Sequence, residues 1–223
     1  KILVNNPKYR HSHTNFLGRV ADILVEEGHE VTSLIAVLAP KLDDCTRKSK
    51  IIHVQASEET ATFYASQASS DADVFSKDLF QFWPHWKNRA DYGYVWSSMC
   101  RTTLETPGLI EQLRAEKFDI MITENIDMCG MGLSHAIGAK SAIMISTTVL
   151  FGHQFEEIGV MRELSYNPSL YTSRFNPHSI VDRFWNIIGE QLHTMQFDRC
   201  RTDVEAVSGK SSALTFPRCT TFR

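Results

Sequence analysis

The sequence has no long hydrophobic run, no concentration of one charge and no dense set of cysteines, and each absence excludes a class of protein. Its 223 residues carry 23 basic and 26 acidic side chains, and no segment gathers lysine and arginine, which argues against a nucleic-acid-binding protein. The longest uncharged run near the middle, residues 141–155, has 15 residues, whereas a helix needs roughly 18 to span a bilayer. We therefore expect no membrane-spanning helix here.

The cysteine and histidine patterns indicate neither a disulfide scaffold nor a metal centre. The five cysteines include no C-x-x-C pair and no zinc-type spacing, and because their number is odd, at least one thiol has no partner within the chain. His11 and His13 stand two residues apart, but no third ligand lies near them in the sequence, so we predict no metal site. The redox compartment and the disulfide state stay open.

Two segments look like phosphate-binding loops but lack residues that such loops need. Gly130 and Gly132 follow a predicted strand, yet His135 stands where a dinucleotide-binding fingerprint has its third glycine. The segment 209–211 (Gly-Lys-Ser) is similar to the end of a P-loop, but Val204 stands at its first glycine and no strand precedes it. We interpret the first as a tight turn and the second as a solvated tail, and we predict no nucleotide cofactor.

The residues that are present indicate an ordinary globular α/β protein, with 43% hydrophobic and 22% charged side chains. Short apolar runs alternate with segments of helical periodicity. The runs predict strands at residues 2–5, 31–38, 51–54, 118–123 and 141–146, and the periodic segments predict helices at 14–27, 106–116 and 132–137 within a chain that is also mostly helical from 58 to 117. This alternation predicts a Rossmann-like parallel sheet with helices on both faces.

Two helix starts can be read from local signals. Thr106-Pro107 resembles an N-cap followed by a first-turn proline. Ser179, with Asp182 at the capping-box position, predicts the start of a long amphipathic helix. One face of that helix would carry the apolar side chains of Ile180, Phe184, Ile187, Ile188 and Leu192. We assign residues 1–207 to one domain and interpret residues 208–223 as an irregular tail or truncation point.

One histidine and one of two carboxylates form the candidate for chemistry. Ligands of open parallel sheets bind beyond the carboxyl ends of the strands. His13 starts the helix that follows the first strand. The positive end of the helix disfavours the imidazolium form, so His13 would stay neutral and able to act as a base. In the usual doubly wound order, strand four lies beside strand one, which brings Glu124, or alternatively Asp127, within reach of His13. A carboxylate in that place would orient the imidazole as half of a dyad, and the alternative is a surface histidine in a polar loop.

Two sequence blocks resemble the UDP-glycosyltransferases, especially invertebrate members similar to UDP-glucuronosyltransferases. The first block is residues 1–32, with Ser12-His13 ending the first loop and Gly-His-Glu-Val-Thr at 28–32 leading into the second strand. The second is residues 118–129, similar to the family pattern F-D-x-x-x-x-[DE]-x-x-x-x-C. Looser similarity extends the resemblance over roughly residues 1–205, and two blocks at family spacing are more specific than a lone motif.

The resemblance implies the N-terminal domain of a GT-B type glycosyltransferase and an inverting sugar transfer. It makes His13 the general base and Glu124 its partner; many relatives have aspartate there, so Asp127 stays the alternative acid. The implied co-substrate is UDP-glucuronic acid or UDP-glucose, with no other cofactor, and the implied acceptor is a small lipophilic alcohol or phenol. The resemblance also implies a place in the endoplasmic reticulum lumen, membrane-associated in the full-length form, and a role in detoxification.

The second, donor-binding domain and the hydrophobic anchor of this family have no counterpart in the 223 residues, so we expect the acceptor-binding half of such an enzyme, truncated. The aromatic segments 80–86 and 92–96 are then candidates for the walls of an apolar acceptor pocket, with plain helix packing as the alternative. The candidate acceptor contacts are Ser12, Phe82, Trp83, Trp86, Phe151 and His153.

Two other functions stay open at this stage. The first alternative is a non-catalytic half that binds small molecules or regulates full-length relatives by pairing with them. This pairing would form a homo- or hetero-oligomer. A free-standing Rossmann-type enzyme is disfavoured because the phosphate-binding fingerprint is absent. A donor signature in the transcript beyond Arg223 would distinguish the first alternative from a transferase.

Overall fold

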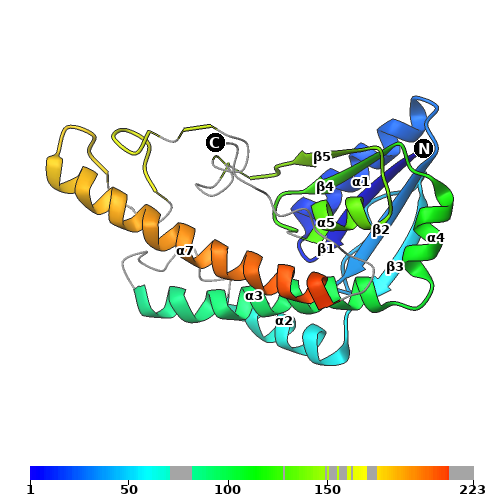
Figure 1. Ribbon diagram of the computed structural model, residues 1–223, viewed down its shortest axis with the longest axis horizontal. Coiled ribbons are helices and arrows are strands. Elements are labelled where there is room, and N and C mark those ends of the chain that lie inside the picture. The colour runs from blue at the N-terminus through cyan, green and yellow to red at the C-terminus, as the bar shows by residue number, and fades with distance from the viewer. Residues whose placement is uncertain are drawn as a thin grey trace.

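The computed structural model describes residues 1–70, 82–127, 129–148, 150, 155, 160–161, 163–169 and 175–210. Helices and strands alternate along most of the chain (Figure 1). In chain order the elements are β1 (Ile2–Lys8), α1 (His11–Glu26), β2 (Val31–Val37), β3 (Lys50–Gln55), α2 (Glu58–Ser70), α3 (Phe82–Glu105), α4 (Leu109–Glu116), β4 (Ile120–Glu124), α5 (Cys129–Ala136), β5 (Ser141–Ile145) and α7 (Ile180–Lys210).

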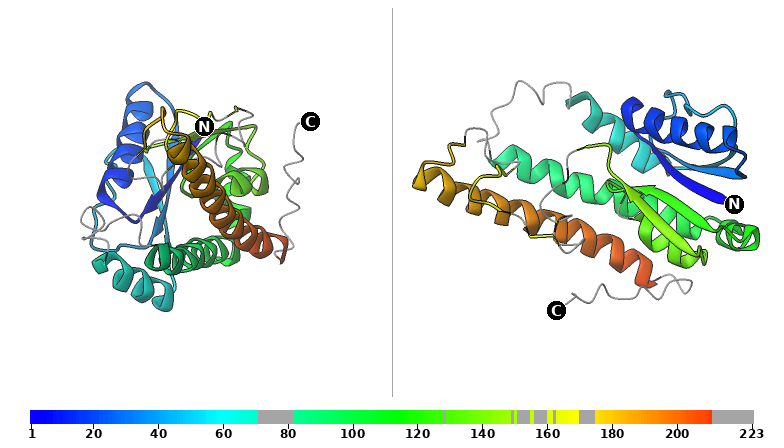
Figure 2. Two further views of the ribbon diagram at one scale, coloured as in Figure 1. Left: turned by 90° about the vertical axis from the view of Figure 1, so that its left-hand side faces the viewer. Right: turned by 90° about the horizontal axis from the view of Figure 1, so that it is seen from above.

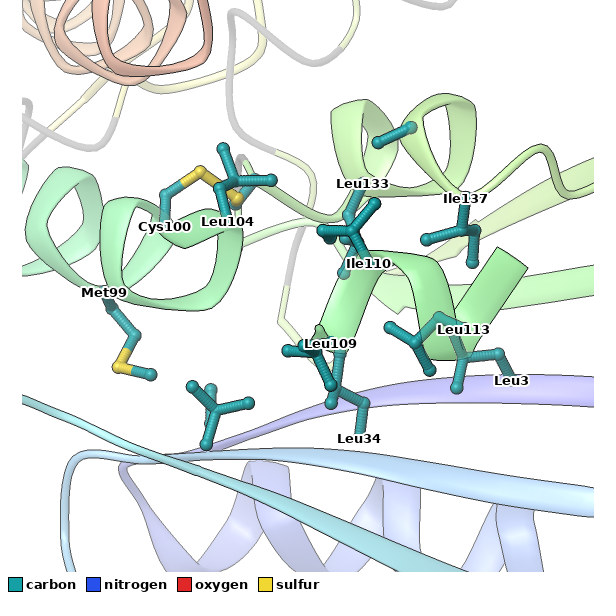
Figure 3. Close-up of a cluster of buried hydrophobic side chains, with 14 of the residues drawn as sticks. Leu3, Leu34, Met99, Cys100, Leu104, Leu109, Ile110, Leu113, Leu133 and Ile137 are labelled. Carbon is teal, nitrogen blue, oxygen red and sulfur yellow. A yellow bond between two sulfur atoms is a disulfide. The ribbon is translucent and has the colours of Figure 1, made fainter. Parts of the chain in front are cut away.

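The strands form one parallel five-stranded sheet in the order β3-β2-β1-β4-β5, with helices on both faces. Helix α1 covers one face, where Leu17 and Ala21 pack against Ile2 and Val4. Helices α3, α4 and α5 cover the other, and Figure 3 shows Leu109 and Leu113 of α4 next to Leu34 and Leu3 of the sheet. This architecture confirms the predicted Rossmann-like fold, including the placement of β4 beside β1.

Strand β1 is longer than the predicted 2–5 and continues through Pro7 to Lys8. The Ile2 N–H donates to the Glu30 carbonyl, 2.8 Å away, so the N–H groups of even-numbered residues face β2 and those of odd-numbered residues face β4. Pairing of β1 with β4 ends at Asn5. The missing N–H of Pro7 therefore leaves no ladder bond unmade, and the proline does not end the strand.

The predicted start of the helix after α3 is two to three residues too early, because α4 begins at Leu109. The Thr106 hydroxyl donates to the Thr102 carbonyl, 2.6 Å away, so Thr106 caps the end of α3 instead of starting α4. Gly108 is the residue before α4, and its φ of 73° lies in the left-handed region that glycine adopts most easily. The glycine, rather than the Thr-Pro pair, therefore sets the boundary between these helices.

Helix α5, by contrast, starts earlier than predicted, at Cys129 instead of residue 132. Its end agrees with the prediction, because Gly138 follows it with a φ of 71°. Gly28 has the same role after α1, with a φ of 88°.

Helix α7 lies side by side with α3, and the pair extends beyond the sheet (Figures 1 and 2). Its predicted start is confirmed, because the Asp182 N–H donates to the Ser179 hydroxyl, 3.2 Å away. The Asp182 carboxylate does not close a capping box and instead accepts from the Asn176 N–H at 3.0 Å. Helix α7 continues to Lys210, into the segment expected to be irregular, and residues 211–223 lie outside the described part. The domain division stays a prediction.

The apolar face predicted for α7 is not buried. Ile180 is 76% exposed and Phe184 is 57% exposed, whereas Asn186 is fully buried. The Asn186 side-chain amide donates to the carbonyls of Leu164 and Asn167, both at 2.8 Å. The helix therefore turns a polar face inward because that face holds the segment 163–169 through hydrogen bonds. Among the described residues, no helix combines the length and the apolar character needed to cross a bilayer.

Candidate active site

The carboxyl ends of β1 and β4 lie next to each other, with Asn5 in register with Thr123. His13 lies in the first turn of α1, directly after β1, and is only 8% exposed. Glu124 is the last residue of β4 and is fully buried. The topology therefore places a histidine and a carboxylate on one rim of the sheet, as the sequence predicts.

His13 and Glu124 form a direct hydrogen bond between Nδ1 and Oε1. An ionised carboxylate can only accept, so the imidazole carries its proton on Nδ1. The other ring nitrogen, Nε2, is then the atom that can take a proton from a bound molecule. This arrangement of base and orienting carboxylate is the one that proton abstraction requires.

A third side chain, Thr147, completes this cluster, and sequence reasoning missed it. The Thr147 hydroxyl lies 2.6 Å from His13 Nδ1 and donates a hydrogen bond to Glu124 Oε1. Thr147 comes two residues after β5, the strand that pairs with β4. The available signal is its position, because polar residues directly after neighbouring parallel strands meet at the same rim.

Aromatic rings pack behind His13. The Tyr9 ring centroid lies 4.7 Å from that of His13, with the two planes tilted by 44°. Trp96 packs edge-on against Tyr9 at 5.1 Å and is 3% exposed. The nearby Tyr94 is 38% exposed, and its hydroxyl donates to Glu59 at 2.9 Å. For Tyr94 and Trp96, these contacts agree with helix packing rather than with the wall of an open pocket.

The alternative acid, Asp127, does not contact His13 and has a different environment. Its Oδ2 accepts from the Asn5 side-chain amide, and its Oδ1 accepts from the Cys129 N–H at 3.0 Å, at the start of α5. Burial raises the pKa of Asp127 to about 6; the hydrogen bonds from Asn5 and Cys129 oppose this shift, and the charge of Glu124 adds to it. Asp127 therefore caps α5 and leaves Glu124 as the partner of His13.

A disulfide lies close to this site. It joins Cys100 of α3 to Cys129 of α5, which are 29 residues apart in the sequence (Figure 3). Cys45 is free and partly buried. Cys100 is one helical turn beyond Trp96. The Cys129 N–H donates a hydrogen bond to Asp127. The disulfide thus fixes the aromatic side of α3 to the capped start of α5.

The remaining predicted contacts are only partly located. Ser12 is exposed in the first turn of α1, next to His13, and His11 is exposed as well. Phe82, Trp83 and Trp86 lie on α3, but their side chains lie outside the described part. Phe151 and His153 lie outside the described residues. The acceptor contacts therefore stay predictions.

A cavity of about 480 Å³ lies at the opposite, amino end of the strands. Lys1, Glu30, Lys50 and Glu116 are among its lining residues. Their charges largely neutralise one another, since Lys1 Nζ lies 3.2 Å from Glu30 and Lys50 Nζ lies 2.8 Å from Glu116. The residues that line this cavity do not include His13, Glu124 or Thr147. Across the described residues, no three His, Cys, Asp or Glu side chains gather as metal ligands would.

The sequence matches a known family along almost its whole length, since a family model described as "UDP-glucoronosyl and UDP-glucosyl transferase" matches residues 1–220. The Caenorhabditis elegans protein named UDP-glucuronosyltransferase ugt-48 is 29% identical over 198 residues, covering 86% of this chain and 37% of that protein. Human UDP-glucuronosyltransferase 3A2 is 26% identical over 193 residues, covering 85% of this chain and 34% of that protein. The solved calicheamicin glycosyltransferase CalG4 is 14% identical, with a TM-score of 0.44 and coverage of 89% of this chain and 44% of its own. The chain therefore spans about a third of the length of these two curated relatives.

Proposed function

Because the chain belongs to the family of UDP-glucuronosyl and UDP-glucosyl transferases, we propose that it supplies the acceptor site and the catalytic base for an inverting sugar transfer. The sugar, glucuronosyl or glucosyl, passes from a UDP-sugar to the hydroxyl of a small lipophilic alcohol or phenol. The observation that supports this role most directly is the buried hydrogen bond between His13 Nδ1 and Glu124 Oε1.

In this reaction His13 Nε2 takes the proton of the acceptor hydroxyl. The acceptor oxygen forms a bond to the anomeric carbon from the face opposite UDP, the bond from that carbon to the phosphate oxygen breaks, and UDP leaves with the electron pair. Glu124 stabilises the imidazolium that forms, because its carboxylate is already hydrogen-bonded to Nδ1. Such a base contributes roughly 10²- to 10⁴-fold to the rate.

We assign the chain to the N-terminal, acceptor-binding domain of a GT-B type enzyme. Two features support this: the chain covers about a third of its relatives' length, and no glycine-rich phosphate loop precedes any of the described helices. Donor binding then belongs to the rest of the protein.

We also propose the endoplasmic reticulum lumen as the location, with membrane association in the full-length form. The Cys100–Cys129 disulfide supports the luminal part of this proposal, because disulfides persist in oxidising compartments.

The test is a fusion of this chain to the C-terminal remainder of the C. elegans relative, assayed for transfer from UDP-glucuronic acid and UDP-glucose to a panel of phenols. His13→Ala should lower turnover by about 10²- to 10⁴-fold with little change in acceptor affinity. His11→Ala is the matched control, because His11 lies on the same helical turn but is exposed. Equal turnover of the His13→Ala and unaltered fusions would contradict the proposal and favour a non-catalytic binding half.

A further inference from the structure

The hydroxyl of Thr147 makes two contacts in the His13–Glu124 pair, and both involve the atoms that decide where the imidazole proton resides. We propose that Thr147 is a positioning residue that, together with Glu124, holds the imidazole of His13 in the form protonated on Nδ1. This inference rests on the proposed function, in which Nε2 of His13 must stay free to accept a proton.

The proton count at this site leaves one consistent arrangement. A threonine hydroxyl has one proton and two lone pairs, and here the proton goes to Glu124 Oε1 because a carboxylate oxygen can only accept. The hydroxyl oxygen, 2.6 Å from His13 Nδ1, therefore faces that nitrogen with a lone pair. Glu124 Oε1 also faces Nδ1 with a lone pair. A proton on Nδ1 satisfies both oxygens, whereas a bare Nδ1 would place three acceptors against one another.

Thr147 matters because Glu124 has few other partners. Glu124 is fully buried, and its second oxygen, Oε2, has no hydrogen-bond partner within the described part of the chain. The Thr147 hydroxyl is therefore one of two donors to this carboxylate there, the other being His13 itself. Without the hydroxyl, the imidazole alone would hold the carboxylate, and the carboxylate would be freer to rotate away.

The ends of β4 and β5 hold Thr147 in place. The Asn125 N–H donates to the Ile145 carbonyl at 2.9 Å, and its side-chain amide donates to the Ser146 hydroxyl at 2.7 Å. The Ser146 hydroxyl donates in turn to the Thr148 carbonyl, also at 2.7 Å. These hydrogen bonds fix the residues on both sides of Thr147. The backbone at Thr147 therefore loses little additional conformational freedom when its hydroxyl forms the hydrogen bond with Glu124.

The experiment is nitrogen-15 NMR of the His13 side chain in the whole chain as it stands. The two ring-nitrogen shifts report which nitrogen carries the proton, and solvent exchange of that proton reports its hydrogen bonding. Unaltered protein and Thr147→Ser should both show a protonated Nδ1. Thr147→Val should show a mixture of both forms and about tenfold faster exchange of the Nδ1 proton, as expected for the loss of one hydrogen bond.

The matched control is Thr103→Val, which removes a buried hydroxyl that donates to the Met99 carbonyl inside α3, 3.0 Å away. It should leave the His13 signals unchanged. If Thr147→Val does not fold, as judged by its amide spectrum, Thr147→Ala makes the same comparison with a smaller side chain. Unchanged His13 signals in a folded Val or Ala variant, or altered signals in the Ser variant, would overturn the proposal. Because the readout requires no turnover, this outcome is independent of the transfer assay.

Discussion

Two carboxylates three residues apart, Glu124 and Asp127, differ in their hydrogen-bond partners. Both are buried at the carboxyl end of β4. Asp127 uses both oxygens, one for the Asn5 side chain and one for the Cys129 N–H. Glu124 uses only Oε1, for His13 and Thr147, and within the described residues Oε2 has no partner.

The difference follows from what each carboxylate faces. Asp127 faces an amide side chain and a helix N-terminus, neither of which changes charge, so its contacts hold the chain in place. Glu124 faces an imidazole that can gain a proton, and its negative charge would stabilise the imidazolium that forms. In this chain, the hydrogen-bond partners thus distinguish Asp127, which holds two segments together, from Glu124, the carboxylate that we propose to act on His13.

Glu124→Gln and Asp127→Asn test this comparison most strongly, measured as turnover of the fused transferase. Glu124→Gln keeps the shape but removes the charge that stabilises the imidazolium, so turnover should fall by about 10²- to 10⁴-fold. Asp127→Asn should cost far less, because Asp127 does not contact His13.

Steady-state acceptor affinity is the control for both variants, and it should change little. A larger loss of turnover for Asp127→Asn than for Glu124→Gln would reverse the assignment of the two carboxylates and make Asp127 the partner of His13.

Topology predicts that His13 meets a carboxylate at the end of β4, Glu124 or alternatively Asp127, and the resemblance to the UDP-glycosyltransferases favours Glu124. Two adjacent parallel strands bring their carboxyl ends together, and each residue lies at or just after such an end. Thr147 also follows the end of a neighbouring parallel strand, β5, but that position indicates only the rim of the sheet and not the contact with Glu124, which depends on the path of the chain after the strand. The fold was predictable for the same reason as the pair, since alternating strands and helices have few ways to pack.

The features that the sequence does not predict depend on partners distant along the chain. Pro7 looks like a strand end until the pairing of β1 with β4 is known to stop at Asn5. The buried face of α7 is polar because Asn186 holds the segment 163–169, and apolar periodicity carries no information about such hydrogen bonds. The pairing of Cys100 with Cys129 likewise requires knowing that α3 and α5 are neighbours.

Removal of the disulfide tests the structural side of the comparison. For a loop of 29 residues, the variant with both Cys100→Ala and Cys129→Ala should lose about 3–4 kcal/mol of unfolding free energy. Urea denaturation measures this loss, and Cys45→Ala is the matched control, because Cys45 is free. If the double variant is as stable as Cys45→Ala, the disulfide does not hold the Asp127 region.

Gly130 tests how tightly the same region is packed. A Cβ at this position would lie 1.8 Å from Thr123 Oγ1 and 3.1 Å from Asn5 Nδ2. Gly130→Ala should therefore lower the unfolding free energy by about 3 kcal/mol, the upper part of the range for overpacking. Met131→Ala, at an exposed position of the same helix, should change it little. A stable Gly130→Ala protein would mean that α5 can shift away from β4 at little cost.

The smallest expected effect is a dependence of stability on pH that comes from Asp127. Burial raises the pKa of this carboxyl from 3.8 to about 6 in the folded chain. Between these values the unfolded chain has released the proton and the folded chain still holds it, so unfolding releases a proton and a rise in pH favours unfolding. The folded state should therefore lose on the order of 2 kcal/mol as the pH rises from about 4 to about 6.5.

Asp127→Asn isolates this effect, because asparagine resembles the protonated acid and does not titrate. Carboxylates whose pKa is lowered, such as Asp119 at about 2, add stability as the pH rises through a lower range. They contribute equally to both proteins and cancel in the difference. The unfolding free energy of Asp127→Asn minus that of the unaltered chain, measured by urea denaturation at several pH values, should increase from about pH 4 to about pH 6.5 and then level off. Parallel curves for the two proteins would show that folding does not raise the pKa of Asp127, and that its two hydrogen bonds at least offset the effect of its burial.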